Sequence, residues 1–259
     1  MKARHATGLA VLAVALAAPA LRADDFRWQG RLAAGATVEV KGVNGGIDAE
    51  PASGPDVEVT AVKRARRSDP DEVEVKVVEH AGGVTICSVY PSRDGVPNQC
   101  GPGGGGRMST RDNDVNVDFR VRVPAGVRFV GRTVNGGIEA RGLPADAEAY
   151  TVNGGIHLEA AGTARGETVN GGIHAALGRA DWQGELRLKT VNGGIHLELP
   201  AGLDAELRAQ TVNGEITTDF PLTVQGRFSK RRISGTIGRG GRQLDLETVN
   251  GGIELRRGT

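Results

Sequence analysis

Three histidines occupy the same place in three successive copies of a short repeat. His157, His174 and His196 each follow the isoleucine of a Val-Asn-Gly-Gly-Ile motif. Because successive side chains of a strand point to opposite faces, an inward isoleucine places the next residue on the outer face. Imidazole commonly binds Zn²⁺, Cu²⁺ and Ni²⁺, so the spacing suggests a divalent-metal site there. The alternative is a solvent-facing position that was copied with the repeat. Carboxylates expected nearby are those of Glu139, Glu159 and Glu198.

An acidic run is the second candidate cation site. Its members are Asp112, Asp114, Asn116 and Asp118. The spacing does not fit an EF-hand loop, because Val117 stands where glycine is required and Val123 where the bidentate glutamate is required. We therefore expect the outward positions of a strand and its approach, with a weak Ca²⁺ site as the alternative.

The sequence contains no signature of a nucleophilic or zinc-dependent enzyme. Gly-x-Ser-x-Gly and His-Glu-x-x-His are both absent. We expect a non-catalytic protein with no cofactor apart from the possible divalent metal. The alternative from a different class is a carbohydrate-active β-helix enzyme centred on residues 50–115, in which Asp114 would act.

Cys87 and Cys100 are the only cysteines. An even number of cysteines in a chain directed to an oxidising compartment favours a disulfide. We therefore predict a disulfide between these two residues.

The motif that carries the histidines recurs along the chain, and it contributes to the high glycine content of 40 in 259 residues. Two degenerate copies, Val212–Ile216 and Ile233–Ile237, extend the series. The spacing between successive copies along the chain is typical of stacked architectures. The unaltered copies are Val43–Ile47, Val134–Ile138, Val152–Ile156, Val169–Ile173, Val191–Ile195 and Val249–Ile253.

Apolar and polar residues alternate on both sides of each motif. Leu186 and Leu188 precede one copy, and Leu197 and Leu199 follow it. This period of two predicts a strand with one buried face on each side of the motif. Asn and Gly tolerate positive φ, so the motif itself can turn the chain. The threonine before each motif falls inward or at the corner.

A single strand-corner-strand unit cannot bury its apolar face, but stacked units can, each about 4.8 Å from the next. We predict an all-β, single-domain β-solenoid of short coils with Asn-Gly corners. Identical residues then align, and stacked amides can hydrogen-bond to one another. An antiparallel β-sandwich or barrel is the alternative, because Asn-Gly also favours hairpins. The predicted ladder comprises Asn44, Asn135, Asn153, Asn170, Asn192, Asn213 and Asn250, with Ser234 in a degenerate copy.

The first 23 residues resemble an export signal. Lys2 and Arg4 precede an apolar run that is too short to span a bilayer, and cleavage is expected after Ala20 or Ala23. No later stretch is apolar enough to span a membrane. We therefore expect an exported protein that is periplasmic, cell-surface or secreted.

The remaining chain divides by its pattern. Residues 24–130 are expected to form an N-terminal β region with longer coils, and a Gly/Pro-rich loop at 91–111 to project from it. Residues 131–259 are expected to form the repeat solenoid.

Charge argues against a nucleic-acid partner. Removal of residues 1–23 leaves 29 basic and 31 acidic residues, a slightly negative balance. Two basic runs, residues 63–67 and 230–232, suit anionic envelope polymers, or are simply solvated loops.

Together these features resemble a known family. Gly-rich corners between alternating strands behind an export signal, with the segment Val121–Gly126 before the dense repeats, are similar to the putative adhesin family of exported bacterial β-strand-repeat proteins. That is a domain-of-unknown-function family, and the likeness covers about residues 35–256. The resemblance implies a β-solenoid exported to the cell envelope or beyond, and it brings no catalytic residues.

The leading functional hypothesis is a non-catalytic, adhesin-like β-solenoid that presents its repeat surface to envelope polymers or surface proteins. The alternatives are the carbohydrate-active enzyme and a metal-binding envelope protein that uses the histidine column.

Overall fold

A computed structural model describes residues 26–179, 182, 184–224 and 229–258. The predicted export signal, residues 1–23, lies outside the described residues.

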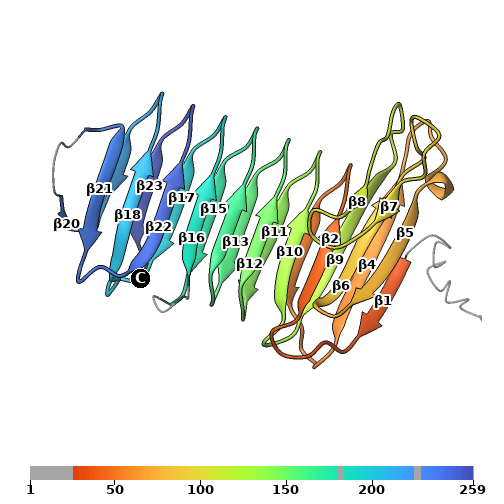
Figure 1. The fold of residues 1–259 in the computed structure, drawn as a ribbon, viewed down its shortest axis with the longest axis horizontal. Coiled ribbons are helices and arrows are strands. Elements are labelled where there is room, and N and C mark those ends of the chain that lie inside the picture. The colour runs from red at the N-terminus through yellow and green to blue at the C-terminus, as the bar shows by residue number, and fades with distance from the viewer. Residues whose placement is uncertain (1–25, 180–181, 183, 225–228, 259) are drawn as a thin grey trace, which may run out of the picture.

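Two long β-sheets run along the molecule and enclose one apolar core (Figure 1). The first sheet contains, in spatial order, β1 (Phe26–Gly30), β4 (Val57–Arg64), β9 (Asn116–Val123), β3 (Ile47–Pro51), β11 (Ile138–Leu143), β13 (Ile156–Ala160), β15 (Ile173–Leu177), β17 (Ile195–Leu199), β23 (Ile253–Arg257) and β19 (Ile216–Thr218). The second contains β20 (Leu222–Thr223), β21 (Arg232–Ile237), β18 (Ala205–Gln210), β22 (Arg242–Glu247), β16 (Glu185–Lys189), β14 (Ala164–Glu167), β12 (Ala147–Tyr150), β10 (Arg128–Arg132), β2 (Thr37–Lys41), β6 (Gly83–Val89) and β5 (Glu74–His80).

Each coil of the repeat region contributes one strand to each sheet. In the coil that turns at Val191–Ile195, β16 lies in the second sheet and β17 in the first. Neighbouring coils pair in parallel and in register, so Ile173 lies between Ile156 and Ile195. This pairing confirms the predicted β-solenoid and excludes the antiparallel sandwich or barrel.

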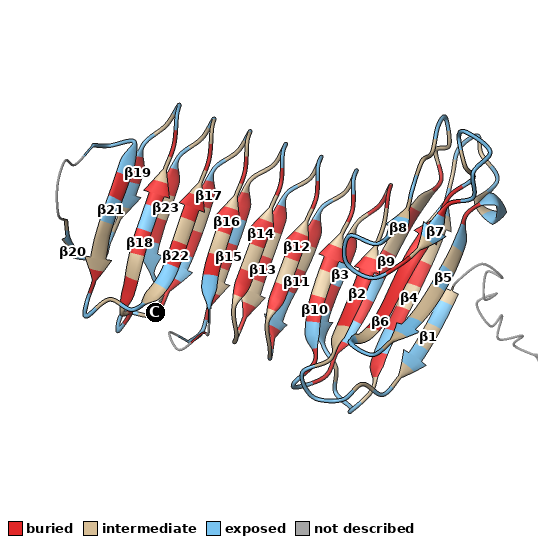
Figure 2. Cartoon of the chain, viewed as in Figure 1, coloured by how far each residue is buried: buried red, intermediate tan, exposed pale blue. Residues whose placement is uncertain are grey.

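The alternating pattern of each strand positions the core. Leu158, Leu188 and Leu197 point inward with no exposed surface, whereas their polar neighbours lie on the outer faces (Figure 2). Burial of a leucine or isoleucine side chain contributes about 1.5–3 kcal/mol. Several such residues in every coil therefore stabilise the stack, although no coil has a core of its own.

The coils do not stack in sequence order at the C-terminal end. The last coil, β22 and β23, lies between the coil of β16 and β17 and the coil of β18 and β19. The chain thus runs from the coil of β16 and β17 to the coil of β18 and β19 at the end of the stack, and then returns so that its last coil lies between these two.

The expectation that Ile233–Ile237 forms a further corner is wrong. These residues lie in β21, which pairs antiparallel with β18 at the end of the second sheet. Ser234 is therefore outside the asparagine column. Its hydroxyl offers no carboxamide to continue the ladder, and Ile233, Thr236 and Ile237 are β-branched residues that favour a strand.

Antiparallel strands close the N-terminal end. The coil of β2 and β3 lies directly beside that of β10 and β11, and β9 and β6 pair in parallel with its outer side. β4 and β1 continue the first sheet antiparallel, and β5 does so in the second. A short 3₁₀ helix, Pro70–Glu72, precedes β5.

The glycine-rich loop before β9 is attached to the second sheet. It contains the paired strands β7 (Gln99–Cys100) and β8 (Gly106–Arg107), and the predicted Cys87–Cys100 disulfide is present. The ammonium group of Lys41 donates to three loop carbonyls at 2.8–2.9 Å, those of Gly101, Gly103 and Gly105.

The two glycines of each motif have different environments. A Cβ on Gly154 would lie 2.0 Å from the carbonyl oxygen of Gly136 in the neighbouring coil, whereas a Cβ on Gly155 would meet nothing closer than 3.6 Å. The same contrast holds in the degenerate copy, where Gly214 is retained and Glu215 replaces the second glycine. The first glycine is therefore required by the close approach of two coils, and the second is not.

We predict that Gly154→Ala lowers the free energy of unfolding by about 2–3 kcal/mol, because its methyl group must push two coils apart. The matched control Gly155→Ala should change it by less than about 1 kcal/mol. Denaturant unfolding measures both changes, and equal losses for the two variants would show that close approach at the first glycine is not the constraint.

Candidate functional site

The turns form a row along one edge of the stack (Figure 1), and hydrogen bonds join the asparagines of neighbouring turns. Each carboxamide nitrogen donates to the carboxamide oxygen of the next asparagine at 2.7–2.9 Å. The row continues inward at one end, where Asn44 donates to the carbonyls of Asn113 and Val115. The spatial order is Asn44, Asn135, Asn153, Asn170, Asn192, Asn250 and Asn213.

The threonines that precede the motif donate hydrogen bonds to the turns from the core side. Thr168 is buried, and its hydroxyl donates to the carbonyl of Gly154 at 3.0 Å. That oxygen is the counterpart, one coil along, of the Gly136 oxygen that crowds Gly154. Equivalent bonds are made by Thr133, Thr151, Thr190, Thr211 and Thr248.

In four copies of the motif the valine faces solvent beside the asparagine column, whereas Val43 is buried and Val191 and Val249 are half-buried. Sequence reasoning did not single out this position, although the alternation offers the signal, since a buried threonine directs the following valine outward. We call the asparagine column together with these valines the turn ridge. The large exposed valines are Val134, Val152, Val169 and Val212, with 39–57% of their surface accessible.

The three histidines lie in register on the outer face of the first sheet. His157 is beside His174, and His174 is beside His196, on β13, β15 and β17. The rings of His174 and His196 are 5.6 Å apart between their centres. Within the described part of the chain, no three His, Cys, Asp or Glu side chains already form a metal-binding group.

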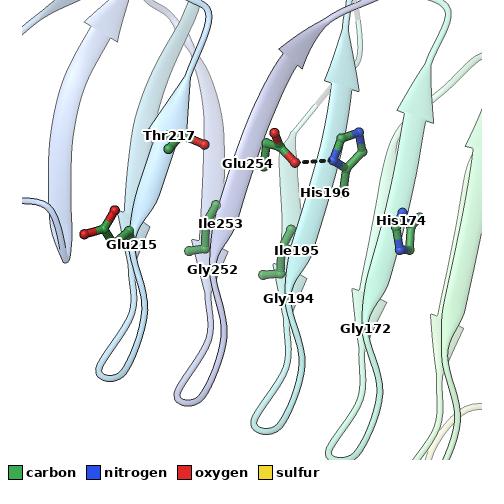
Figure 3. Close-up of a pocket in the computed structure, with 10 residues that line it drawn as sticks. All are labelled: Gly172, His174, Gly194, Ile195, His196, Glu215, Thr217, Gly252, Ile253 and Glu254. Carbon is green, nitrogen blue, oxygen red and sulfur yellow. Dashed lines mark hydrogen bonds and ion pairs between the residues drawn. The ribbon is translucent and has the colours of Figure 1, made fainter.

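Carboxylates engage two of these histidines. His157 Nε2 lies 2.9 Å from Glu159, on the same strand. His196 Nδ1 lies 2.9 Å from Glu254 on the neighbouring β23 (Figure 3). Hydrogen bonds from His196 and Arg256 lower the pKa of the Glu254 carboxyl.

The acidic run near β9 is divided among local partners. Asp114 accepts hydrogen bonds from the backbone N–H groups of Ser68 at 2.8 Å and Arg67 at 3.2 Å. Asp118 instead pairs with Arg64 and accepts from the backbone of Gly46. These two carboxylates therefore contact different segments of the chain.

Hydrogen bonds to Asp114, first among them that from the Ser68 backbone, lower the pKa of its carboxyl to about 2. Asp114 is therefore ionised near neutral pH, which suits a structural anchor and not a proton donor.

Fold and surface define a β-solenoid repeat protein with a continuous turn ridge. Residues 136–256, most of the repeat region, match the model of the Toastrack DUF4097 family. The match supports the resemblance to a domain-of-unknown-function family.

Several solved structures resemble the chain. A "putative cell adhesion protein" from Clostridium sporogenes ATCC 15579 is 10% identical, and the likeness covers 91% of this chain and 100% of that one with a TM-score of 0.47. A "putative adhesin" from Parabacteroides distasonis ATCC 8503 is 11% identical, with coverages of 90% and 97% and a TM-score of 0.30. A third, from Bacteroides fragilis NCTC 9343, is 9% identical, with coverages of 91% and 98% and a TM-score of 0.31.

No curated protein matches the sequence. In the described ranges, no helix is long and apolar enough to cross a membrane.

We predict that ladder substitutions destabilise the protein according to the number of bonds they remove. Asn170 donates one bond and accepts another, whereas Asn213, at the end of the ladder, only donates. With about 0.5–1 kcal/mol for each hydrogen bond, Asn170→Ala should cost about twice as much as Asn213→Ala in urea unfolding. Equal costs would contradict a ladder in which each bond contributes independently.

We also predict a pH-dependent contribution from Asp114. Because its pKa is lower in the folded state than in the unfolded chain, the stabilisation is present above about pH 4 and is lost as the pH falls towards 2. The difference in free energy of unfolding between the wild type and Asp114→Asn should therefore narrow from pH 5 to pH 2. A constant difference over that range would contradict the assignment.

Proposed function

We propose that this protein is a non-catalytic, exported β-solenoid whose turn ridge binds a component of the cell envelope or of another surface. The observation that carries the proposal is the ridge itself, in which the exposed valines of three adjacent coils, Val134, Val152 and Val169, lie beside a continuous row of exposed carboxamides.

The chemistry of the ridge suits a partner with a linear repeat. Adjacent coils present the same groups about 4.8 Å apart, so an extended polymer can contact several coils in the same way. Each carboxamide uses one N–H within the ladder and retains a second donor for a partner. The valines add apolar contact area along the same line, and contiguous exposed apolar surface is typical of binding sites.

Two further observations favour an extracytoplasmic, non-enzymatic role. The Cys87–Cys100 disulfide is typical of oxidising compartments. Asp114, the residue named for the enzyme alternative, is engaged by backbone N–H groups. Both observations are accounted for by structural roles of these residues.

The basic runs are partly neutralised and contribute less to the proposal. Lys63 pairs with Asp71 and Arg67 lies 3.7 Å from Asp114. Lys230 pairs with Glu215 at 3.3 Å. We therefore assign recognition to the ridge and not to a cationic patch.

Co-sedimentation of the purified chain with isolated envelope fractions tests this proposal. We predict that Val134→Ser/Val152→Ser/Val169→Ser weakens binding at least about tenfold, because apolar contact is lost at three adjacent coils. Prior digestion of the fraction with protease or with polysaccharide-degrading enzymes tells a protein partner from a glycan.

A triple variant with valines away from the ridge serves as the matched control. Val62, Val96 and Val130 are partly or largely exposed, so Val62→Ser/Val96→Ser/Val130→Ser removes the same groups elsewhere. This control should bind like the wild type. Absence of binding to every fraction, or equal losses in both triple variants, would overturn the proposal.

A further inference from the structure

His196 stands between two carboxylates on the outer face of the first sheet. Its Nδ1 lies 2.9 Å from Glu254, and its Nε2 lies 3.3 Å from Glu198. A neutral imidazole carries one ring hydrogen, and the shorter contact assigns it to Nδ1, where it donates to Glu254. Nε2 then directs a lone pair towards a carboxylate oxygen, an arrangement that a cation between the two atoms would stabilise.

The distance between Nε2 of His196 and the Glu198 oxygen fits a shared zinc ion. Zn–N bonds are about 2.0–2.1 Å and Zn–O bonds about 2.0–2.2 Å, so two such ligands on a tetrahedral ion lie roughly 3.3–3.5 Å apart. The observed separation of 3.3 Å is in that range.

His174 supplies the third donor from the neighbouring strand. It projects from β15 beside His196 on β17, with the ring centres 5.6 Å apart (Figure 3). Two imidazoles on one Zn²⁺ have ring centres roughly 5–6 Å apart, given the same bond lengths. Ala176 stands where the other histidine strands carry glutamate, so no carboxylate on its own strand competes for the His174 ring.

The site is accessible and needs only side-chain rotation. The side chains of His196 and Glu198 are 30% and 50% exposed. On the same face, a pocket of about 410 Å³ is lined in part by His174, His196 and Glu254, although not by Glu198. No three donors are gathered at one point among the described residues, so the His174 ring must turn towards Nε2 of His196. Rotation of a partly exposed side chain is fast and costs little.

We propose that His174, His196 and Glu198 bind one divalent transition-metal ion, with Glu254 orienting His196 through its Nδ1–H. A carboxylate that accepts the second ring N–H of a metal-binding histidine fixes the ring and raises its basicity. This assignment is narrower than a site shared by the whole histidine column, because His157 is paired with Glu159. It does not depend on the proposed binding function of the turn ridge.

Calorimetric titration of the full, untagged chain with Zn²⁺ alone tests the proposal. We expect one ion per chain, and at least about tenfold weaker binding in His174→Ala, His196→Ala and Glu198→Gln. Glu254→Ala should weaken binding about 10- to 100-fold, as substitutions in the outer shell of zinc sites do.

The remaining histidines provide matched controls. His80→Ala and His157→Ala should bind Zn²⁺ like the wild type. In the unmodified protein, the imidazole NMR signals of His174 and His196 should shift on Zn²⁺ addition, whereas those of His80 and His157 should not. The proposal is overturned by an absence of Zn²⁺ binding, by unchanged binding in His174→Ala, or by an equal loss in His157→Ala.

Discussion

The structure depends on how closely neighbouring coils approach at the first glycine of each motif. A side chain there would lie about 2.0 Å from a backbone oxygen, so only glycine allows the turns to stack. The same approach lets the Gly171 N–H donate to the Asn192 carbonyl at 2.9 Å and brings the carboxamides into hydrogen-bonding distance. This contact fixes how neighbouring turns align. The register of the sheets, the threonine hydrogen bonds and the turn ridge all depend on that alignment.

The alternation of apolar and polar residues along each strand is sufficient to predict which side chains face inward. Leu186 and Leu188 alternate with charged neighbours and are buried, and the histidines lie outside and in register because each follows a buried isoleucine. These predictions succeed because they require only the period of a strand and not its neighbours. The disulfide is predicted separately, by an even number of cysteines in a chain with an expected export signal.

The spatial order of the coils could not be predicted in the same way. Six identical motifs offer identical turns, so the motif does not specify that Asn250 lies between Asn192 and Asn213. Ile233–Ile237 resembled a degenerate corner, but its lone glycine and β-branched residues form an antiparallel edge strand. The exposure of the valines is likewise not predicted, because apolar residues are usually buried in a core.

The chemistry of the candidate sites likewise depends on cross-strand partners that are distant in sequence. The sequence makes the three histidines equivalent, whereas the structure places Glu254 beside His196 alone, across 58 residues. The sequence alone makes Asp114 a candidate residue of an enzyme, whereas in the structure its carboxylate accepts hydrogen bonds from the backbone of Ser68 and Arg67. The proposed histidine site thus lies at outer-face positions, which the repeat leaves free to vary.

The central claim is that coils stack through backbone contacts at the turn glycines, with the last coil inserted between two earlier ones. NMR scalar couplings across hydrogen bonds measure this directly in the labelled protein. The structure predicts couplings from the Gly193 N–H to the Asn250 carbonyl and from the Gly251 N–H to the Asn213 carbonyl, bonds of 2.9 and 3.0 Å. A coupling from the Gly193 N–H to the Asn213 carbonyl, as stacking in sequence order requires, would contradict it.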